Sequence, residues 1–167
     1  MADVLRRISI QHEDFDVGAE WTRLREQQGG SSGAMAAFCG VVRDRVESES
    51  VASLELEHYP GMTEQSIEAI VDRARQRWRL DAVVVIHRVG RLAPSDQIVL
   101  VLATSRHRQD ALAACAFVID LLKTEAVFWK REITPSGARW VESTGTDHSR
   151  ASEWNAARPN QPVSGEG

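Results

Sequence analysis

Apolar positions recur along the chain with two different spacings, which predict strands and helices in alternation. Residues 34–42 form a continuous apolar run of small side chains, which predicts a buried strand. In residues 51–59 apolar and polar positions alternate, as in a half-buried strand. Further strands are predicted over 4–10, 82–90 and 97–105, and a hairpin is predicted on either side of a turn at 135–137.

Three amphipathic segments predict helices between these strands, over 14–28, about 63–78 and 106–123. Thr63 is a suitable N-cap for the second helix. In the third helix, Leu112, Cys115 and Leu122 lie on one apolar side. The resulting order, β-α-β-β-α-β-β-α-β-β, predicts an α+β fold in which helices pack on a mixed sheet.

The composition narrows the class of protein. A length of 167 residues suits one domain with a sizeable core, and 43% hydrophobic and 26% charged residues are ordinary for a globular protein. The net charge of -4 excludes a global basic field for nucleic acid or an anionic membrane, so any anion site has to be local. No apolar run approaches the ~20 residues that span a bilayer, and the N-terminus lacks the apolar core of a signal peptide. We therefore expect a cytoplasmic protein.

Cys39 and Cys115 are the only cysteines. We interpret them as two buried free thiols, and a disulfide or a catalytic thiol is the alternative. The sequence contains no HExxH, CxxC, P-loop or GxGxxG motif, so no metal site is predicted.

Lysine usage singles out two positions. Of the 20 lysines and arginines, only Lys123 and Lys130 are lysines. Unlike arginine, a lysine that is buried or close to other cations can lose its proton and act as a base or nucleophile. Lys123 ends the third predicted helix and Lys130 lies on the next strand, so we expect the two to be near each other. The alternative is compensation of the helix dipole by Lys123 and a solvated strand position for Lys130.

Residues 103–110 join the end of a strand to the start of a helix, where Ser105 can act as a cap. Arg106, His107 and Arg108 place cations at this helix N-terminus, although cations are unfavourable there. A bound phosphate would reverse that penalty; the alternative is that these side chains point into water. Arg43 follows the strand 34–42, and by itself indicates no more than a strand that exits into a loop.

Five blocks of sequence occur together and in order, from about residue 34 to residue 143. They are FCGVVRDR, LELEHYPGMTEQSIEAIVDRARQRW, VVVIHRVGRLAPSDQIVLVLATSRHR, FVIDLLKTEAVFWKRE and GARWVES. Together they resemble the large, catalytic subunit of molybdopterin synthase, and LEHYPGM and LKT…FWKRE are the most specific parts. The resemblance implies an α/β hammerhead-type mixed sheet with packed helices and a smaller β-rich part. Residues 1–145 would form a single catalytic domain, and 146–167 a short helix and a polar, disordered tail.

The resemblance also implies an activity. Members of that family are sulfurtransferases of molybdenum cofactor biosynthesis, which convert cyclic pyranopterin monophosphate (precursor Z) to molybdopterin by inserting two dithiolene sulfurs. The sulfur arrives as a thiocarboxylate on the C-terminal Gly-Gly of a small ubiquitin-like subunit, whose tail enters the large subunit. The assembly is a heterotetramer around a central homodimer of large subunits. No metal or organic cofactor is implied.

Site residues follow from the same resemblance, position by position. Lys123 takes the place of the main catalytic lysine and Lys130 that of a second one. The implied substrate-binding positions are Val41, Val42, Arg43, His107, Arg108, Lys123, Lys130, Arg131 and Glu132. The family commonly has a basic residue in place of Val41, so only a backbone contact is implied there. His107 and Arg108 are expected to reach the substrate of the other copy in the dimer.

Two other hypotheses use the same residues. The first is a non-catalytic regulatory module that binds a phosphate or nucleotide, whose affinity would survive replacement of both lysines by arginine. The second is a scaffold whose dimer binds a ubiquitin-like partner without chemistry.

Overall fold

The computed structural model describes residues 5–156, which form two four-stranded sheets, a short hairpin and four helices. The larger sheet has the order β1 (Leu5–Gln11), β6 (Ala82–Arg88), β8 (Gln97–Ser105), β2 (Ala34–Val41). The smaller sheet has the order β10 (Gly137–Trp140), β9 (Phe128–Thr134), β5 (Ser53–His58), β7 (Gly90–Leu92). The hairpin pairs β3 (Arg45–Val46) with β4 (Glu49–Ser50). The helices are α1 (Val17–Gln28), α2 (Met62–Arg77), α3 (Arg108–Glu125) and α4 (Gly145–Ala156).

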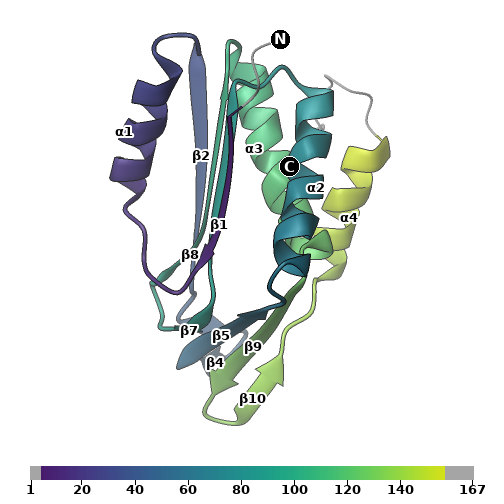
Figure 1. Cartoon of the computed structure of the whole chain (residues 1–167). Helices are drawn as coiled ribbons and strands as arrows, with labels where there is room; N and C mark the ends of the chain where they lie inside the picture. Colours follow the sequence, from purple (N-terminus) through teal and green to yellow (C-terminus); the bar gives the residue numbers. More distant parts are fainter. Residues whose placement is uncertain (1–4, 157–167) are drawn as a thin grey trace.

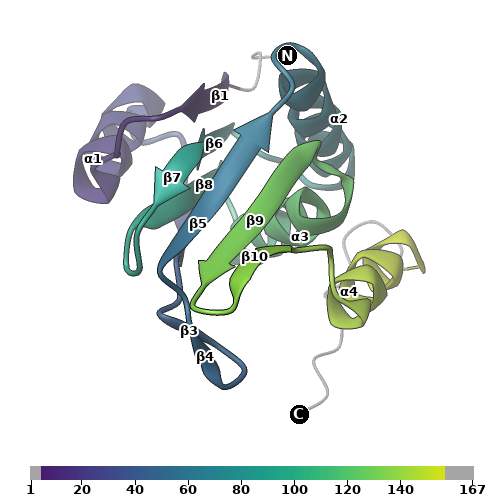
Figure 2. The same cartoon turned by 90° about the horizontal axis from the view of Figure 1, so that it is seen from below.

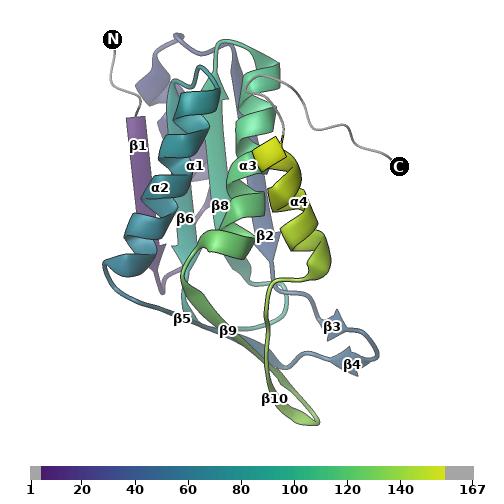
Figure 3. The same cartoon turned by 90° about the vertical axis from the view of Figure 1, so that its right-hand side faces the viewer.

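The larger sheet is mixed, because β1 runs parallel to β6 whereas the β6–β8 and β8–β2 pairs are antiparallel. Helix α1 covers one face of it, α2 and α3 cover the other, and α4 packs outside α3 (Figures 1 and 3). The predicted α+β fold and the predicted order of its main elements are confirmed.

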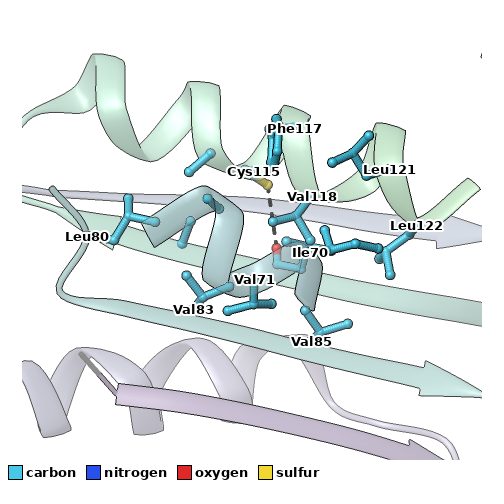
Figure 4. Close-up of a cluster of buried hydrophobic side chains, with 14 of the residues drawn as sticks. Ile70, Val71, Leu80, Val83, Val85, Cys115, Phe117, Val118, Leu121 and Leu122 are labelled. Carbon is cyan, nitrogen blue, oxygen red and sulfur yellow. Dashed lines mark hydrogen bonds between the residues drawn. The ribbon is translucent and has the colours of Figure 1, made fainter. Parts of the chain in front are cut away.

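The core lies on both faces of the larger sheet because alternate residues of β6 and β8 point to opposite sides. Val83, Val85 and Val101 pack against α2 and α3, where Ile67 and Phe117 are fully buried (Figure 4). On the other face, Leu100 and Leu102 are among the residues that pack under α1. Each fully buried aliphatic or Phe side chain contributes roughly 1.5–3 kcal/mol, so this packing holds α2 and α3 firmly on the sheet.

The smaller sheet lies at one end of the larger one. In Figure 2, which views the molecule from that end, β5 and β9 cross in front of the larger sheet. A third apolar cluster, of Val42, Leu54, Leu56, Val89 and Leu92, joins the sheets, with Ile10, Ile98 and Phe128 against it. Strand β7 follows β6 after one residue and begins at Gly90, which has φ +92°. A side chain there would be strained and would lie 2.8 Å from the His12 ring.

Several local predictions were wrong. Helix α2 has Gly61 as its N-cap, and the Glu64 carboxylate accepts the Gly61 N–H. Thr63 instead lies buried inside the helix, where its hydroxyl donates to the Val127 carbonyl at 2.7 Å. Helix α3 begins at Arg108 with His107 as N-cap, so Ser105 precedes the cap, although its oxygen accepts the His107 N–H.

The predicted burial of two apolar segments was also wrong. Strand β2 is an edge strand of the larger sheet, and Phe38 and Val41 on it are exposed. Leu112, expected on the apolar side of α3, is 62% exposed. Helix α3 packs on β2 and β8, so it lies over the edge of the larger sheet at which β2 is found. Residues 43–50, predicted as a loop, contain the short β3–β4 hairpin.

The last predicted helix is present as α4, and it packs against α3 through buried Ala151 and Trp154. The predicted disordered tail falls largely on residues 157–167, which lie outside the described residues.

Candidate active site

Lys130 is the third residue of β9, and its side chain is half-buried on the face of the smaller sheet that meets the larger one. It forms no ion pair or side-chain hydrogen bond with any residue in 5–156. Burial lowers the pKa of the Lys130 amine, and the positive charges of Lys123 and Arg43 lower it further, against the raising effect of Glu132 and Asp147. The solvated position that was the alternative for Lys130 is therefore wrong, and a neutral amine is easier to form here than on a free lysine.

Lys123 lies in the last turn of α3, and its ammonium is close enough to Lys130 to act on that amine. Its side chain is 55% exposed, and its Nζ lies 3.7 Å from Oδ1 of Asp147 in the first turn of α4. The structure thus brings the two lysines together, as expected from a helix end and the strand that follows it. Compensation of the helix dipole by Lys123 is compatible with the same position.

Arg43 reaches this region because β2 changes register between Gly40 and Val41. Beyond this irregularity the chain leaves the larger sheet, and the Val42 N–H and carbonyl bond to Asp96 and Ser95 instead. Val41, Val42 and Arg43 line a cavity of about 40 Å³ together with Lys130 and Glu132. Ligand pockets for molecules of substrate size measure about 300 Å³ or more, so this cavity is only part of a site.

The run 130–132 divides between the two faces of β9 because neighbouring strand residues point in opposite directions. Glu132 faces the cavity with Lys130, is 5% exposed, and accepts a hydrogen bond from Arg139 Nη2 at 2.9 Å. Arg131 lies on the outer face, where it pairs with Glu55 and stacks over the Trp140 ring. The structure therefore does not bring the Arg131 side chain together with the lysines.

His107 and Arg108 lie at the other end of α3 from Lys123. The helix has 18 residues, so at about 1.5 Å per residue its two ends are roughly 27 Å apart. Gly33, Arg106, His107, Arg108 and Gln109 line an open groove of about 350 Å³ there. Within one chain, the predicted site thus falls into two parts, a lysine end and a His-Arg end.

Two residues at the lysine end were not predicted from the sequence. Asp147 forms an ion pair with Lys123, and Arg139 forms one with Glu132. The sequence does predict a helix start near Asp147, because Thr144 and Asp147 have the spacing of a helix capping box. Thr144 and Asp147 do form reciprocal hydrogen bonds at the start of α4.

Other candidate groups have structural explanations. Both cysteines are free thiols, and burial raises the pKa of Cys115 to about 12 and also raises that of Cys39. His87 stacks on Phe128 with ring centroids 3.9 Å apart. Among residues 5–156, no cluster of His, Cys, Asp and Glu could hold a metal ion, and no helix is long and apolar enough to cross a membrane.

Comparison with known proteins agrees with the resemblance. Residues 10–125 match the family model described as MoaE protein. The molybdopterin synthase catalytic subunit of Ralstonia nicotianae is 51% identical over 153 residues, which cover 92% of this chain and 86% of that protein. The molybdopterin biosynthesis MoaE protein from Burkholderia ambifaria MC40-6 aligns with a TM-score of 0.77 and 49% identity, over 90% of this chain and 99% of that one.

A more distant structure shares the fold. It is a protein-protein complex of subunit 1 and 2 of molybdopterin-converting factor from Helicobacter pylori 26695, and it aligns with a TM-score of 0.66 and 18% identity over 80% of this chain and 89% of that one. The family model covers most of the chain, and relatives that are about 50% identical in sequence span nearly all of it. The chain therefore belongs to the MoaE family of molybdopterin synthase catalytic subunits, which are enzymes.

Proposed function

We propose that this chain converts precursor Z to molybdopterin, with two sulfurs taken from the C-terminal thiocarboxylate of a small ubiquitin-like subunit. The observation that carries the proposal is the position of Lys130, a half-buried amine with a lowered pKa beside Lys123 and Arg43 at the cavity. Sulfur transfer from an acyl carrier develops negative charge on the acyl oxygen and moves protons between sulfur, oxygen and a base. Fixed cations serve the first need, and an amine that exchanges its proton serves the second.

The substrate carries a cyclic phosphate, and Arg43 is the exposed arginine at the cavity that can bind it with charge-assisted hydrogen bonds. We assign the remaining phosphate and pterin contacts to His107 and Arg108 of a second copy. The cavity of about 40 Å³ in one chain supports this assignment, because it is too small for the substrate on its own.

The border formed by β2 and α3 suits a two-fold contact. No described strand pairs with the outer edge of β2, and Phe38, Val41 and Leu112 expose apolar surface beside it. An unpaired apolar edge is normally covered, and a second copy that pairs its own β2 in antiparallel orientation would cover it.

The same two-fold axis would bring the two parts of the site together. Arg108, Leu112, Ala116, Ile119 and Lys123 share one side of α3, with Ala116 near the middle. The middle of α3 lies beside the middle of β2. The Cys115 thiol of α3 contacts the Val101 carbonyl of β8 at 3.7 Å (Figure 4), and Val101 pairs with Phe38 of β2. In an isologous contact centred there, Arg108 of one copy lies beside Lys123 of the other.

The small subunit is the second partner in this proposal. The solved Helicobacter pylori structure of the same fold is a complex of two subunits, which supports an assembly of this kind. A thin acyl tail ending in Gly-Gly needs less room than the pterin, and the lysine end is where its thiocarboxylate would have to arrive.

The first test replaces each lysine with arginine, which keeps the charge and removes the exchangeable amine. With thiocarboxylated small subunit and precursor Z, we expect K123R and K130R to lose at least about 100-fold in turnover, the usual range for loss of acid-base catalysis. R150K, a conservative exchange of a partly exposed arginine on α4, is the matched control. Near-normal product formation by K123R would refute the lysine mechanism, and small-subunit binding without any product from the wild type would favour a scaffold.

The second test asks whether two copies share each site. K123A and a double variant, H107A with R108A, should each be inactive alone. If the copies exchange at random, half of the dimers are mixed and one of their two sites is intact, so the mixture should recover about a quarter of wild-type activity. No recovery in a mixture shown by mass spectrometry to contain mixed dimers would contradict the shared site.

A further inference from the structure

The first turn of α4 holds a carboxylate against Lys123. Oδ1 of Asp147 lies 3.7 Å from Nζ of Lys123, and the Asp147 side chain is only 22% exposed. In the described part of the chain, no other carboxylate forms an ion pair with Lys123. Lys123 therefore has a dedicated counter-ion, whereas Lys130 has none within the same residues.

The Asp147 carboxylate is fixed in orientation. Its Oδ2 accepts hydrogen bonds from the N–H and the hydroxyl of Thr144, both at 2.8 Å, which leaves Oδ1 toward Lys123. Burial raises the pKa of this carboxyl, but the hydrogen bonds from Thr144 and the charge of Lys123 outweigh burial and lower the pKa overall. The group thus remains an anion.

Helix α4 is itself anchored to α3, so the carboxylate has a rigid base. Trp154 is 2% exposed, packs edge-on against Phe117, and donates its Nε1–H to Asp120 at 2.7 Å. At the other end, the Ser143 hydroxyl donates to the Lys123 carbonyl. The carboxylate and the lysine are consequently held by the same pair of packed helices.

We propose that Asp147 is a positioning residue of this active site, which pairs with the Lys123 ammonium so that Lys123 rests protonated and serves as the proton donor while Lys130 supplies the neutral amine. Two neighbouring amines repel each other when both are charged, and an unequal environment decides which one keeps its proton. Charged groups around the pair are Asp147 from α4, Arg43 after β2 and Glu132 on β9. Of the two carboxylates, Glu132 is engaged by Arg139, and only Asp147 forms an ion pair with a lysine.

The inference rests on the proposed function for its catalytic meaning, but the pairing can be tested without turnover. Because the chain has only two lysines, an N-hydroxysuccinimide ester followed by mass spectrometry reports the acylation rate of each one. D147N keeps an oxygen for the Thr144 hydrogen bonds and removes the charge. We expect it to raise the acylation rate of Lys123 at pH 7.5 about two- to fivefold, the worth of a partly exposed ion pair. E153Q removes a carboxylate from the same helix and should leave that rate unchanged.

The second readout is the pH profile of turnover in the complex with the small subunit. In D147N the ammonium loses its counter-ion and is neutralised more easily, so the alkaline limb of kcat should move to lower pH. D147E should restore it, whereas a merely structural role would lower Tm and leave the profile in place. An unchanged Lys123 acylation rate in folded D147N, or an unchanged profile in active D147N, overturns the inference. A wild type that makes no molybdopterin overturns the proposed function instead, and the acylation result then stands alone for the pairing.

Discussion

His87 should make the stability of this protein sensitive to mild acid. The side chain is 8% exposed, stacks on Phe128, and has Nδ1 2.8 Å from the Arg88 carbonyl. Burial lowers its pKa from 6.5 to about 4, against the raising effect of the hydrogen bond with the Arg88 carbonyl, and Lys130 and His58 add smaller lowering contributions. In the unfolded chain the imidazole titrates near its ordinary value.

The sign follows from proton binding. Between pH 6.5 and about pH 4, the unfolded chain binds a proton at His87 and the folded chain does not, so the free energy of unfolding falls as the pH falls. At about 1.4 kcal/mol per pKa unit, the full window is worth about 3 kcal/mol. That is a large part of the 5–15 kcal/mol that stabilises a typical domain.

H87F should remove this loss because phenylalanine keeps the stack on Phe128 and cannot take up a proton. The assay is urea unfolding followed by tryptophan fluorescence from pH 7 to pH 4.5, at one protein concentration because a dimer would add a concentration term. H148Q, which removes an exposed histidine, is the control and should keep the wild-type slope. If H87F loses as much stability over this range as the wild type, burial of a neutral imidazole is not the cause.

Three further predictions concern α4, the lysine end and the two-fold border. W154A should lower the free energy of unfolding by about 3–5 kcal/mol, as for other buried aromatic residues, and a loss below about 1 kcal/mol in urea would mean that α4 unfolds separately. K130M should raise Tm at pH 7 while turnover is lost, because the folded state disfavours the charged amine. Wild-type stability, but not that of K130M, should then rise as the pH approaches 10.5, which urea unfolding between pH 7 and pH 10 can measure. L112E should give monomers in sedimentation equilibrium and abolish turnover, and an intact active dimer would exclude this border as the contact.

Periodicity was enough to predict most strands and helices, but it could not distinguish two kinds of apolar surface. Phe38 and Val41 in the run 34–42, and Leu112, were expected in the core, and all three are exposed. A side chain buried by its own chain and one that awaits a second copy have the same apolar character. Only the position of β2 at the edge of the sheet separates the two cases.

The part of the site that uses an otherwise rare residue type was predictable from the sequence. Lys123 and Lys130 stand out against a background of arginine, and the structure does bring them together. Arg131 could have been separated from Lys130 by strand alternation alone, since neighbours on a strand face opposite sides. Asp147 was not predictable from spacing to Lys123, because its position depends on how α4 packs on α3.

The length of α3 links these observations. Helix α3 holds Lys123 in its last turn and Arg108 at its start, about 22 Å apart at about 1.5 Å per residue, whereas a bicyclic or tricyclic pterin spans far less. No rearrangement of side chains can close that distance inside one chain while the core under α3 stays packed. The same rigid helix, placed antiparallel to its copy, would juxtapose the two ends twice and produce two equivalent sites from one contact. On this proposal the exposed β2 edge and the exposed Leu112 are part of the catalytic design, and a monomer that folds normally should bind the small subunit and still make no product.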